Sequence, residues 1–296
     1  MVCVPAVYDI MYRKLLKGIE KKGKLETVKK AVKISNALLK LKIDVKKKLF
    51  AEIHANLGGK LRILVAGGAA LDPATEKGFR DLGFNLLQGY GLTETAPVVA
   101  VGLTNCRKLG SIGKKFPSVE VKILEPNEEG IGELLVKGPS VMLGYYNNDE
   151  ATKSAIDEES WFHTGDLAKI DKDGFIYITG RKKNVIVLQN GKNIYPEELE
   201  ILINKIEGRK ESMIYGMPED GDLTISAKIV YDKKAMTELY GAENEEKIEE
   251  LINEEIKKIN KTMPAYKYIR EISVTDQPLI KTTTQKIKRF EEMKRI

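Results

Sequence analysis

The sequence lacks the features that mark secreted and membrane-spanning proteins. Its 296 residues contain two cysteines, Cys3 and Cys106, which are too few for a disulfide framework or a zinc cluster. No apolar run approaches the roughly 18 residues that a membrane helix needs. No charged and apolar leader of the secretory type opens the sequence either. We therefore expect a cytoplasmic protein in a reducing compartment, without a transmembrane segment.

Aromatic residues are scarce among the many lysines at the start of the chain. Residues 1–60 hold 15 Lys and Arg against 5 Asp and Glu, although the whole chain has a net charge of only +6. Such a basic segment can bind nucleic acid or anionic lipid. Its only aromatic residues are Tyr8, Tyr12 and Phe50, whereas single-stranded nucleic acids are bound on stacked aromatics. We expect a solvated helical face and no nucleic-acid partner, and peripheral membrane contact stays open as an alternative.

The first part of the chain predicts an α/β arrangement. Hydrophobic residues make up 42% and charged residues 31%, enough for a packed core, and the length suggests about two domains. Residues 5–57 are predicted to be helical. The apolar run 61–66, ending in two glycines, predicts a buried strand. Asp72 and Pro73 are typical of a helix start, and 84–89 predicts the next strand. Strand, helix and strand form an α/β unit.

The composition changes at Gly110 and again after Gly180. Short runs between glycines and prolines predict strands at 119–124, 132–137 and 175–180, as in a small β-rich subdomain. A helix start at Tyr195 and Pro196, a strand at 223–231, an amphipathic helix at 245–259, a strand at 272–275 and a basic helix to the terminus predict an α+β domain. We therefore expect a partial large domain over 1–180 (1–109 and 110–180) and a mobile C-terminal domain over 181–296.

Two motifs in the first part indicate a nucleotide site. In 88–95, Gly89 and Gly91 flank Tyr90 after a predicted strand, so the backbone can approach a flat ligand. Thr93 and Glu94 then offer a hydroxyl and a carboxylate for a phosphate and a hard cation. Asp166, beside a glycine, is of the type that accepts two hydrogen bonds from ribose. The alternatives are an ordinary strand-to-loop turn and an acid that caps a turn, and His163 is expected to be structural.

Two further motifs lie in the last part of the chain. Gly180 to Lys183 is a charged, glycine-led junction, typical of a hinge. Thr282 to Arg289 places hydroxyls beside a lysine and could bind phosphate, although a solvated basic tail is the alternative. The segment from Gly18 to Leu25 matches part of a phosphate-loop pattern, but no strand precedes it and Leu25 replaces the metal-binding hydroxyl. We interpret it as two glycines between helices.

Five separated segments, in order, resemble one family, the AMP-forming acyl-CoA synthetases of the adenylate-forming superfamily. They are Gly67-Gly68-Ala69-Ala70-Leu71, Tyr90-Gly91-Leu92-Thr93-Glu94, Thr164-Gly165-Asp166, residues 180–200 and residues 282–289. Because of its lysine-rich helical stretch, the sequence resembles the long-chain fatty acid branch of this family in particular. The resemblance implies the C-terminal part of the adenylate-forming α/β fold, followed by a small α+β domain. It also implies fatty acid–CoA ligation with ATP, AMP, Mg²⁺ and coenzyme A.

The resemblance also implies a role for individual residues. Gly89, Tyr90 and Gly91 would border adenine, Thr93 would contact the α-phosphate, and Glu94 would help to hold magnesium. Asp166, aided by Arg181, would bind the ribose hydroxyls. In the last domain, Lys183 matches the hinge, Gly191 matches the pantetheine loop, and Lys286 matches the lysine that reaches the α-phosphate during adenylation. Gly67, Gly68, Ala69 and Ala70 would border the acyl pocket.

The sequence departs from the family in two places. Gln285 stands where many relatives have glycine before the lysine. No Ser/Thr/Gly-rich loop for the β- and γ-phosphates occurs in the 296 residues. We therefore expect a C-terminal portion that needs a separate N-terminal half for adenylation and that catalyses no ATP–pyrophosphate exchange alone. The alternative is a non-catalytic fragment that binds nucleotide, coenzyme A or a protein.

Overall fold

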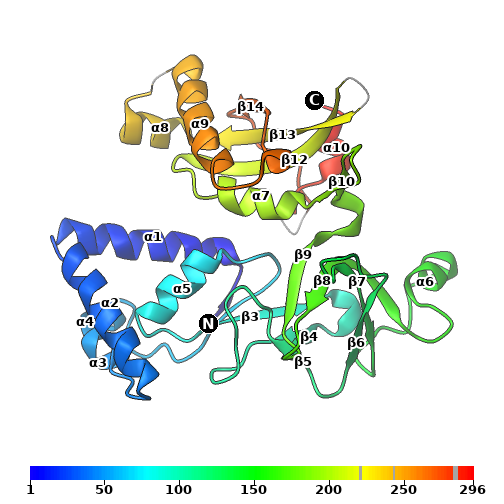
Figure 1. Cartoon of the computed structure of the whole chain (residues 1–296), viewed down its shortest axis with the longest axis horizontal. Coiled ribbons are helices and arrows are strands. Elements are labelled where there is room, and N and C mark those ends of the chain that lie inside the picture. Colours follow the sequence, from blue (N-terminus) through cyan, green and yellow to red (C-terminus); the bar gives the residue numbers. More distant parts are fainter. Residues whose placement is uncertain (220–221, 243, 283–285) are drawn as a thin grey trace. The chain divides into compact units, whose positions relative to one another are not determined.

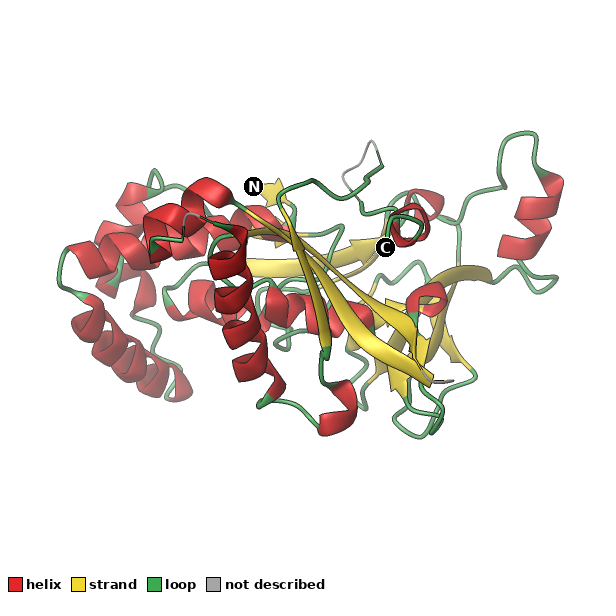
Figure 2. Cartoon of the chain, turned by 90° about the horizontal axis from the view of Figure 1, so that it is seen from above, coloured by secondary structure: helices red, strands yellow, loops and turns green. Residues whose placement is uncertain are grey.

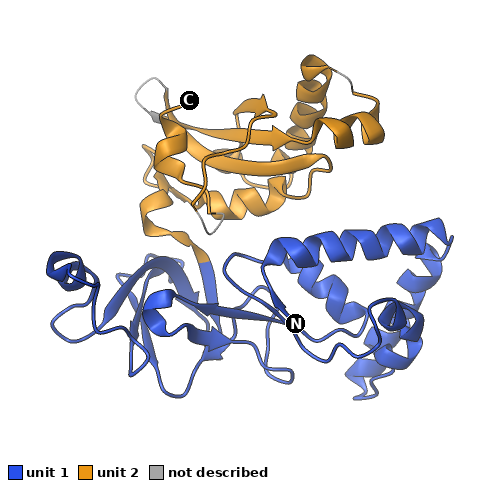
Figure 3. Cartoon of the chain, turned by 180° about the vertical axis from the view of Figure 1, so that it is seen from behind, with its two compact units in different colours: residues 1–178 blue, residues 179–296 orange. Residues whose placement is uncertain are grey.

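The computed structural model describes residues 1–219, 222–242, 244–282 and 286–296. The chain divides into two compact units, Met1–Ile178 and Thr179–Ile296 (Figure 3). Unit 1 contains the predicted nucleotide motifs up to Asp166, and unit 2 contains those from Arg181 onward.

Unit 1 begins with helices, as predicted for 5–57. They are α1 (Pro5–Lys21), α2 (Leu25–Lys40), α3 (Lys46–Leu49) and α4 (Ala51–Asn56). Helix α5 (Pro73–Asp81) starts at the predicted cap, where the Asp72 carboxylate accepts the Ala74 N–H at 3.1 Å. Helices α1, α2 and α5 pack on one another at one end of the unit (Figure 1). Their core includes Tyr8 and Phe79, which meet edge to face.

A five-stranded sheet adjoins these helices. Its strands are β1 (Val2–Cys3), β2 (Leu64–Ala66), β3 (Leu86–Gly91), β4 (Val98–Val101) and β5 (Lys114–Lys115), in that order. Strands β1, β2 and β3 run parallel, and β4 and β5 are antiparallel to their neighbours. The predicted strands 61–66 and 84–89 are confirmed, although β2 is shorter and β3 extends to Gly91. Strand β1 was not predicted because it has only two residues.

A four-stranded sheet forms the rest of unit 1, which confirms the predicted β-rich region. Its order is β6 (Glu120–Leu124), β7 (Gly132–Lys137), β8 (Phe162–Ile170) and β9 (Ile176–Arg181), and α6 (Asp149–Ala155) precedes β8. Buried residues of the two sheets share one core, which includes Val99, Leu134, Ala168 and Ile176. Strand β8 was not predicted as such, although it carries Asp166.

Unit 2 is an α+β unit with an isoleucine-rich core. Strands β12 (Arg209–Glu219) and β13 (Asp222–Tyr231) form a long twisted antiparallel pair (Figure 2), and β14 (Glu271–Thr275) adds in parallel to β13. The helices are α7 (Pro196–Ile203), α8 (Lys233–Tyr240), α9 (Glu245–Asn260) and α10 (Arg289–Met293), and β10 (Ile186–Val187) pairs with β11 (Asn193–Ile194).

The basic helix predicted to reach the terminus is wrong in extent. Only Arg289–Met293 is helical. Before this helix, Thr282 N–H donates to Lys286 O at 2.8 Å and Lys288 N–H donates to Ile280 O at 2.8 Å. These two hydrogen bonds use backbone groups that a helix would need.

Candidate nucleotide-binding site

The turn after β3 is closed by a buried threonine. The Thr95 hydroxyl accepts the Leu92 N–H at 3.0 Å and lies 2.9 Å from Pro97 O, to which it donates. These bonds fold Thr93–Thr95 into a 3₁₀ turn. Thr95 is fully buried, whereas Thr93 is exposed and Glu94 is half-buried. The two predicted phosphate and metal ligands therefore lie at the accessible side of a rigid turn.

The two glycines around Tyr90 have different structural reasons. A Cβ at Gly91 would lie 1.6 Å from Pro97 O, so the close approach of this residue to β4 requires glycine. A Cβ at Gly89 would make ordinary contacts, the nearest at 3.6 Å. Gly91 is therefore explained by chain packing. Gly89 is not explained by packing, and its predicted place beside adenine stays a prediction.

Glu94 is held by two contacts with the loop before α6. Its carboxylate accepts the Tyr145 hydroxyl at 3.1 Å, and its carbonyl accepts the Met142 N–H at 2.8 Å. Burial and the bond to Glu94 raise the pKa of Tyr145. No group of three His, Cys, Asp or Glu side chains forms a metal cluster among the described residues. One fixed carboxylate suits Mg²⁺, which is commonly held by one or two carboxylates plus substrate phosphates.

The structure brings the predicted adenine and ribose residues together. The Tyr90 hydroxyl donates to Asp166 Oδ2 at 2.5 Å, although the two residues come from β3 and β8 of different sheets. Asp166 is 5% exposed. It lies on the buried side of β8, where positions 162, 164, 166 and 168 alternate inward. A carboxylate at such a position is costly to bury unless it has partners, and Tyr90 is one of them.

The segment predicted to border an acyl pocket follows β2 directly. Gly67 N–H donates to Cys3 O at 3.3 Å, and a Cβ at Gly67 would lie 3.4 Å from Gly89 O. Gly68, Ala69 and Ala70 are exposed. Because β2 and β3 are parallel, their carboxyl ends meet at one edge of the sheet. This edge carries both the predicted acyl segment and the predicted adenine turn, and ligands commonly bind at such an edge.

Four predicted site residues belong to unit 2. Arg181 ends β9 and is half-buried, and Lys183 is exposed in a 3₁₀ turn formed by Lys182–Asn184. Gly191 is exposed in the hairpin between β10 and β11, with a φ of 76° that favours glycine. Lys286 is exposed in the segment before α10.

Ionic contacts that sequence reasoning missed anchor the segment around Lys286. Arg289 binds both oxygens of Glu200 at 2.6 and 2.7 Å. Lys228 binds the buried Glu292 at 2.8 Å. Burial raises the pKa of Glu200, and Arg289 opposes that shift. No sequence signal identifies these pairs, because the partners lie 89 and 64 positions apart along the chain. The departure at Gln285 lies outside the described residues.

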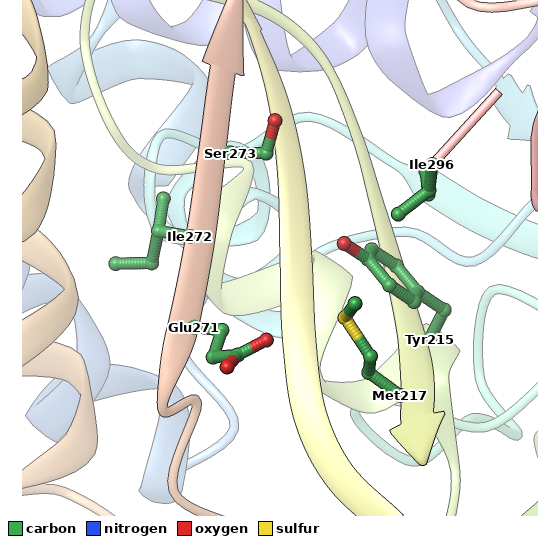
Figure 4. A pocket seen from close by; sticks show the side chains of 6 residues that line it. All are labelled: Tyr215, Met217, Glu271, Ile272, Ser273 and Ile296. Atoms are coloured by element: carbon green, nitrogen blue, oxygen red, sulfur yellow. The ribbon is translucent and has the colours of Figure 1, made fainter. Parts of the chain in front are cut away.

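A shallow hollow on unit 2 contains no predicted site residue. It is lined by Tyr215, Met217, Glu271, Ile272, Ser273 and Ile296 (Figure 4). Among the described residues, no helix is both long and apolar enough to span a bilayer. His163 lies 3.6 Å from Glu133 and 3.6 Å from Asp157.

Comparison with known proteins agrees with this geometry. The family model for "AMP-binding enzyme" matches residues 1–146. A long-chain-fatty-acid–CoA ligase of Salmonella typhimurium is 38% identical over 189 residues, covering 62% of this chain and 32% of that protein. Long-chain-fatty-acid–[acyl-carrier-protein] ligase AEE15 of Arabidopsis thaliana is 30% identical over 277 residues, covering 86% of this chain and 37% of that protein.

Solved structures give the same result. The o-succinylbenzoate CoA synthetase MenE of Bacillus subtilis, in complex with its acyl-adenylate intermediate, matches with a TM-score of 0.65 and 26% identity, over 83% of this chain and 49% of that one. The anthranilate CoA ligase AuaEII, in complex with anthranoyl-AMP, has a TM-score of 0.64 and 25% identity, over 79% and 44%.

The chain spans about a third of the length of the curated relatives it matches. Within that span, the sequence comparisons and the structural comparisons agree. Residues 1–146 match the AMP-binding enzymes, and the predicted resemblance to the AMP-forming acyl-CoA synthetases and their adenylate-forming fold is confirmed.

Proposed function

We propose that this chain contributes the adenosine site and the C-terminal lysine of a fatty acid–CoA ligase. In the first half-reaction, a fatty acid carboxylate attacks the α-phosphorus of ATP, and acyl-AMP and pyrophosphate form. In the second, the thiol of coenzyme A attacks the acyl carbonyl, and AMP leaves. The observation that carries the proposal is the hydrogen bond between Tyr90 and the buried Asp166, beside the turn with Thr93 and Glu94.

The Tyr90–Asp166 pair suits recognition of adenosine. A carboxylate has two oxygens with several acceptor positions, so Asp166 can accept ribose hydroxyls while it keeps the bond to Tyr90. The hydroxyl of Tyr90 is fixed by Asp166, and its ring is then held at one position beside Gly89. Arg181 would aid the ribose contact. Preorganised polar groups of this kind bind without reorganisation when the ligand arrives.

The phosphate chemistry needs cations. Thr93 would contact the α-phosphate, and Glu94 would hold Mg²⁺ together with the phosphates. Magnesium and Lys286 would stabilise the negative charge that develops on phosphate oxygens in adenylation. Two half-reactions at one site need two arrangements of the domain that covers it. Movement of unit 2 at Lys183 would therefore withdraw Lys286 after adenylation and bring in the Gly191 hairpin for the thioester step.

The acyl and thiol substrates are proposed from the names of the relatives. Several are long-chain-fatty-acid–CoA ligases, so we propose a long-chain fatty acid and coenzyme A in a cytoplasmic setting. AEE15 is named for an acyl-carrier-protein acceptor. Competition between the two thiols in the transfer step distinguishes them.

Nucleotide binding by the full chain tests the proposal. We expect AMP to bind, and Asp166→Ala to weaken binding by about 2–4 kcal/mol, the value of two charge-assisted hydrogen bonds. Asp173→Ala is the control, because it removes an exposed carboxylate of the same unit. Absence of AMP binding by the wild-type chain would refute the adenosine site. Equal affinity of the Asp166 and Asp173 variants would remove Asp166 from it.

Pyrophosphate exchange tests the catalytic part. The assay is run on the chain alone and with a polypeptide that carries a family phosphate loop, with palmitate as the acid. We expect exchange in the mixture and none with the chain alone. AMP binding without exchange in either sample would favour the alternative, a non-catalytic nucleotide- or coenzyme A-binding protein.

One specific observation favours an additional membrane-surface contact. The corner between α2 and α4 exposes Leu41 (70%), Ile43 (51%) and Leu49 (47%) beside the exposed lysines 40, 42, 47 and 48. Apolar side chains among lysines are typical of segments that lie on anionic bilayers. We expect sedimentation with phosphatidylglycerol vesicles and not with phosphatidylcholine vesicles. Leu41→Ser with Ile43→Ser should abolish it, whereas binding only to DNA would contradict the lipid proposal.

A further inference from the structure

We propose that Glu133 is a positioning residue that fixes a bulge in β8 and thereby aims Asp166 at the ribose. The inference rests on the proposed adenosine site and concerns how that site is built. Glu133 lies in β7, outside the five segments that resemble the family.

The motif Thr164-Gly165-Asp166 forms the bulge. Glu133 pairs with Leu167 and Leu135 pairs with His163, so the single residue Leu134 faces three residues of β8. Extra residues in one strand bend it and change the direction of its side chains, and such bulges are frequent beside active sites. Asp166 is the last of these three residues, so its backbone lies at the end of the bulge, directly before the regular pairing of Leu167 with Glu133.

Hydrogen bonds from β7 fix the bulge. The Gly165 N–H donates to Glu133 Oε1 at 3.1 Å, and the Thr164 hydroxyl donates to Leu134 O at 2.7 Å. The Thr164 hydroxyl in turn accepts the Asp166 N–H at 3.1 Å. Gly165 has a φ of 67°, in the left-handed region that favours glycine. The Glu133 carboxylate therefore holds the backbone N–H of the residue directly before Asp166.

The burial of Glu133 is not explained by packing. Residues 132–136 of β7 are all buried, and Glu133 is the only charged one among them, at 6% exposure. A buried carboxylate costs free energy unless it is bound by partners. Its second oxygen lies 3.6 Å from His163 Nδ1, and His163 Nε2 lies 3.6 Å from Asp157. The buried Glu133 carboxylate therefore has the Gly165 N–H and His163 among its partners.

Binding of two nucleotides tests the proposal. AMP carries the two ribose hydroxyls that would donate hydrogen bonds to Asp166, and 2′,3′-dideoxy-AMP lacks both. We expect Glu133→Ala to weaken AMP binding about tenfold or more, because small misplacements of a binding group have large effects. It should leave the affinity for dideoxy-AMP within about twofold. Glu133→Gln keeps an oxygen acceptor for Gly165 and should restore most of the AMP affinity.

A second pair of variants does not alter Glu133. Gly165→Ala and Gly174→Ala both add a methyl group at a positive φ (67° and 82°), and in both places the methyl group meets nothing within 4 Å. The strain is therefore matched, but Gly174 lies in the turn after β8. We expect only Gly165→Ala to weaken AMP binding selectively. Near-ultraviolet circular dichroism checks that each variant is folded.

The outcomes are distinct. If the wild-type chain does not bind AMP, the proposed adenosine site is refuted, and this inference with it. If it binds AMP and Glu133→Ala binds equally well, only the positioning role is refuted. Equal loss of AMP and dideoxy-AMP binding would show a general structural role and would also overturn the proposal. In an Asp166→Ala background, Glu133→Ala should cause no further loss, because the two residues act through one contact.

Discussion

Gly91→Ala should destabilise unit 1 far more than Gly89→Ala, although both glycines flank Tyr90. Neither residue has a positive φ, so the comparison isolates the space available for a methyl group. At Gly91 the new Cβ would lie 1.6 Å from Pro97 O, 2.6 Å from Pro97 C and 2.9 Å from Val98 Cα. At Gly89 the three nearest atoms lie at 3.6 to 3.8 Å.

The size of the effect follows from these contacts. Pro97 O must move by about 1.4 Å to reach the 3.0 Å that real Cβ contacts respect, and a backbone atom cannot rotate away as a side chain can. Overpacking of this kind costs about 1–3 kcal/mol, and we expect a value near the upper end for Gly91→Ala. Gly89→Ala should be neutral or stabilising by up to about 1 kcal/mol, because alanine loses less entropy on folding.

Differential scanning calorimetry of the full chain measures the effect. For a unit of this size, about 3 kcal/mol corresponds to a fall of about 6–12 °C in Tm. The transition of unit 2 should stay unchanged and is the internal control. Equal Tm values for the two variants would refute the steric argument. A loss of AMP affinity in Gly91→Ala without any loss of stability would show instead that Gly91 acts on the ligand.

Three further predictions concern charged residues. Lys286→Ala should slow adenylation far more than transfer from a preformed acyl adenylate, and equal loss in both assays would contradict the two-arrangement mechanism. Arg289→Leu leaves the Glu200 carboxylate, which is 14% exposed, without its cation and should lower the free energy of unfolding of unit 2 by about 3–5 kcal/mol. Adding Glu200→Leu should recover only part of this loss in denaturant titrations, because the Ile214 N–H then loses its acceptor. The bond from Lys108 lowers the pKa of Asp171 to about 2. Its stabilisation is therefore present above the unfolded pKa of about 3.9 and is lost as the pH falls toward 2. Asp171→Asn should flatten the dependence of Tm on pH within that window, and an unchanged slope would contradict this assignment.

Local signals predicted the parts of the fold that depend on neighbouring residues. The Asp72–Pro73 start of α5, the amphipathic face of α9 and the apolar runs of β2 and β3 all act within a few positions. Strand β12 was missed because its sequence, RKESMIYGMPE, mixes charged residues with glycine and proline. Pairing with β13 and packing under α7 decide its conformation. Tertiary context of this kind commonly overrides local propensity.

The residues of the candidate site were proposed from the sequence, whereas the contacts that orient them were not predictable from it. Tyr90, Glu94 and Asp166 were predicted from residue type and resemblance, but the bond between Tyr90 and Asp166 joins residues 76 positions apart. The same holds for Glu200 with Arg289 and for Tyr145 with Glu94.

Gly165 illustrates why the orienting contacts are invisible in the sequence. A glycine between Thr and Asp is compatible with any tight turn, and only the register of β7 against β8 makes it the centre of a bulge. That register leaves Leu134 opposite three residues and brings Glu133 within 3.1 Å of the Gly165 N–H. Because Glu133 acts on a backbone group, its role depends on strand pairing and not on a spacing along the chain. Residues that position a binding group through the backbone are therefore found only once the pairing of the strands is known.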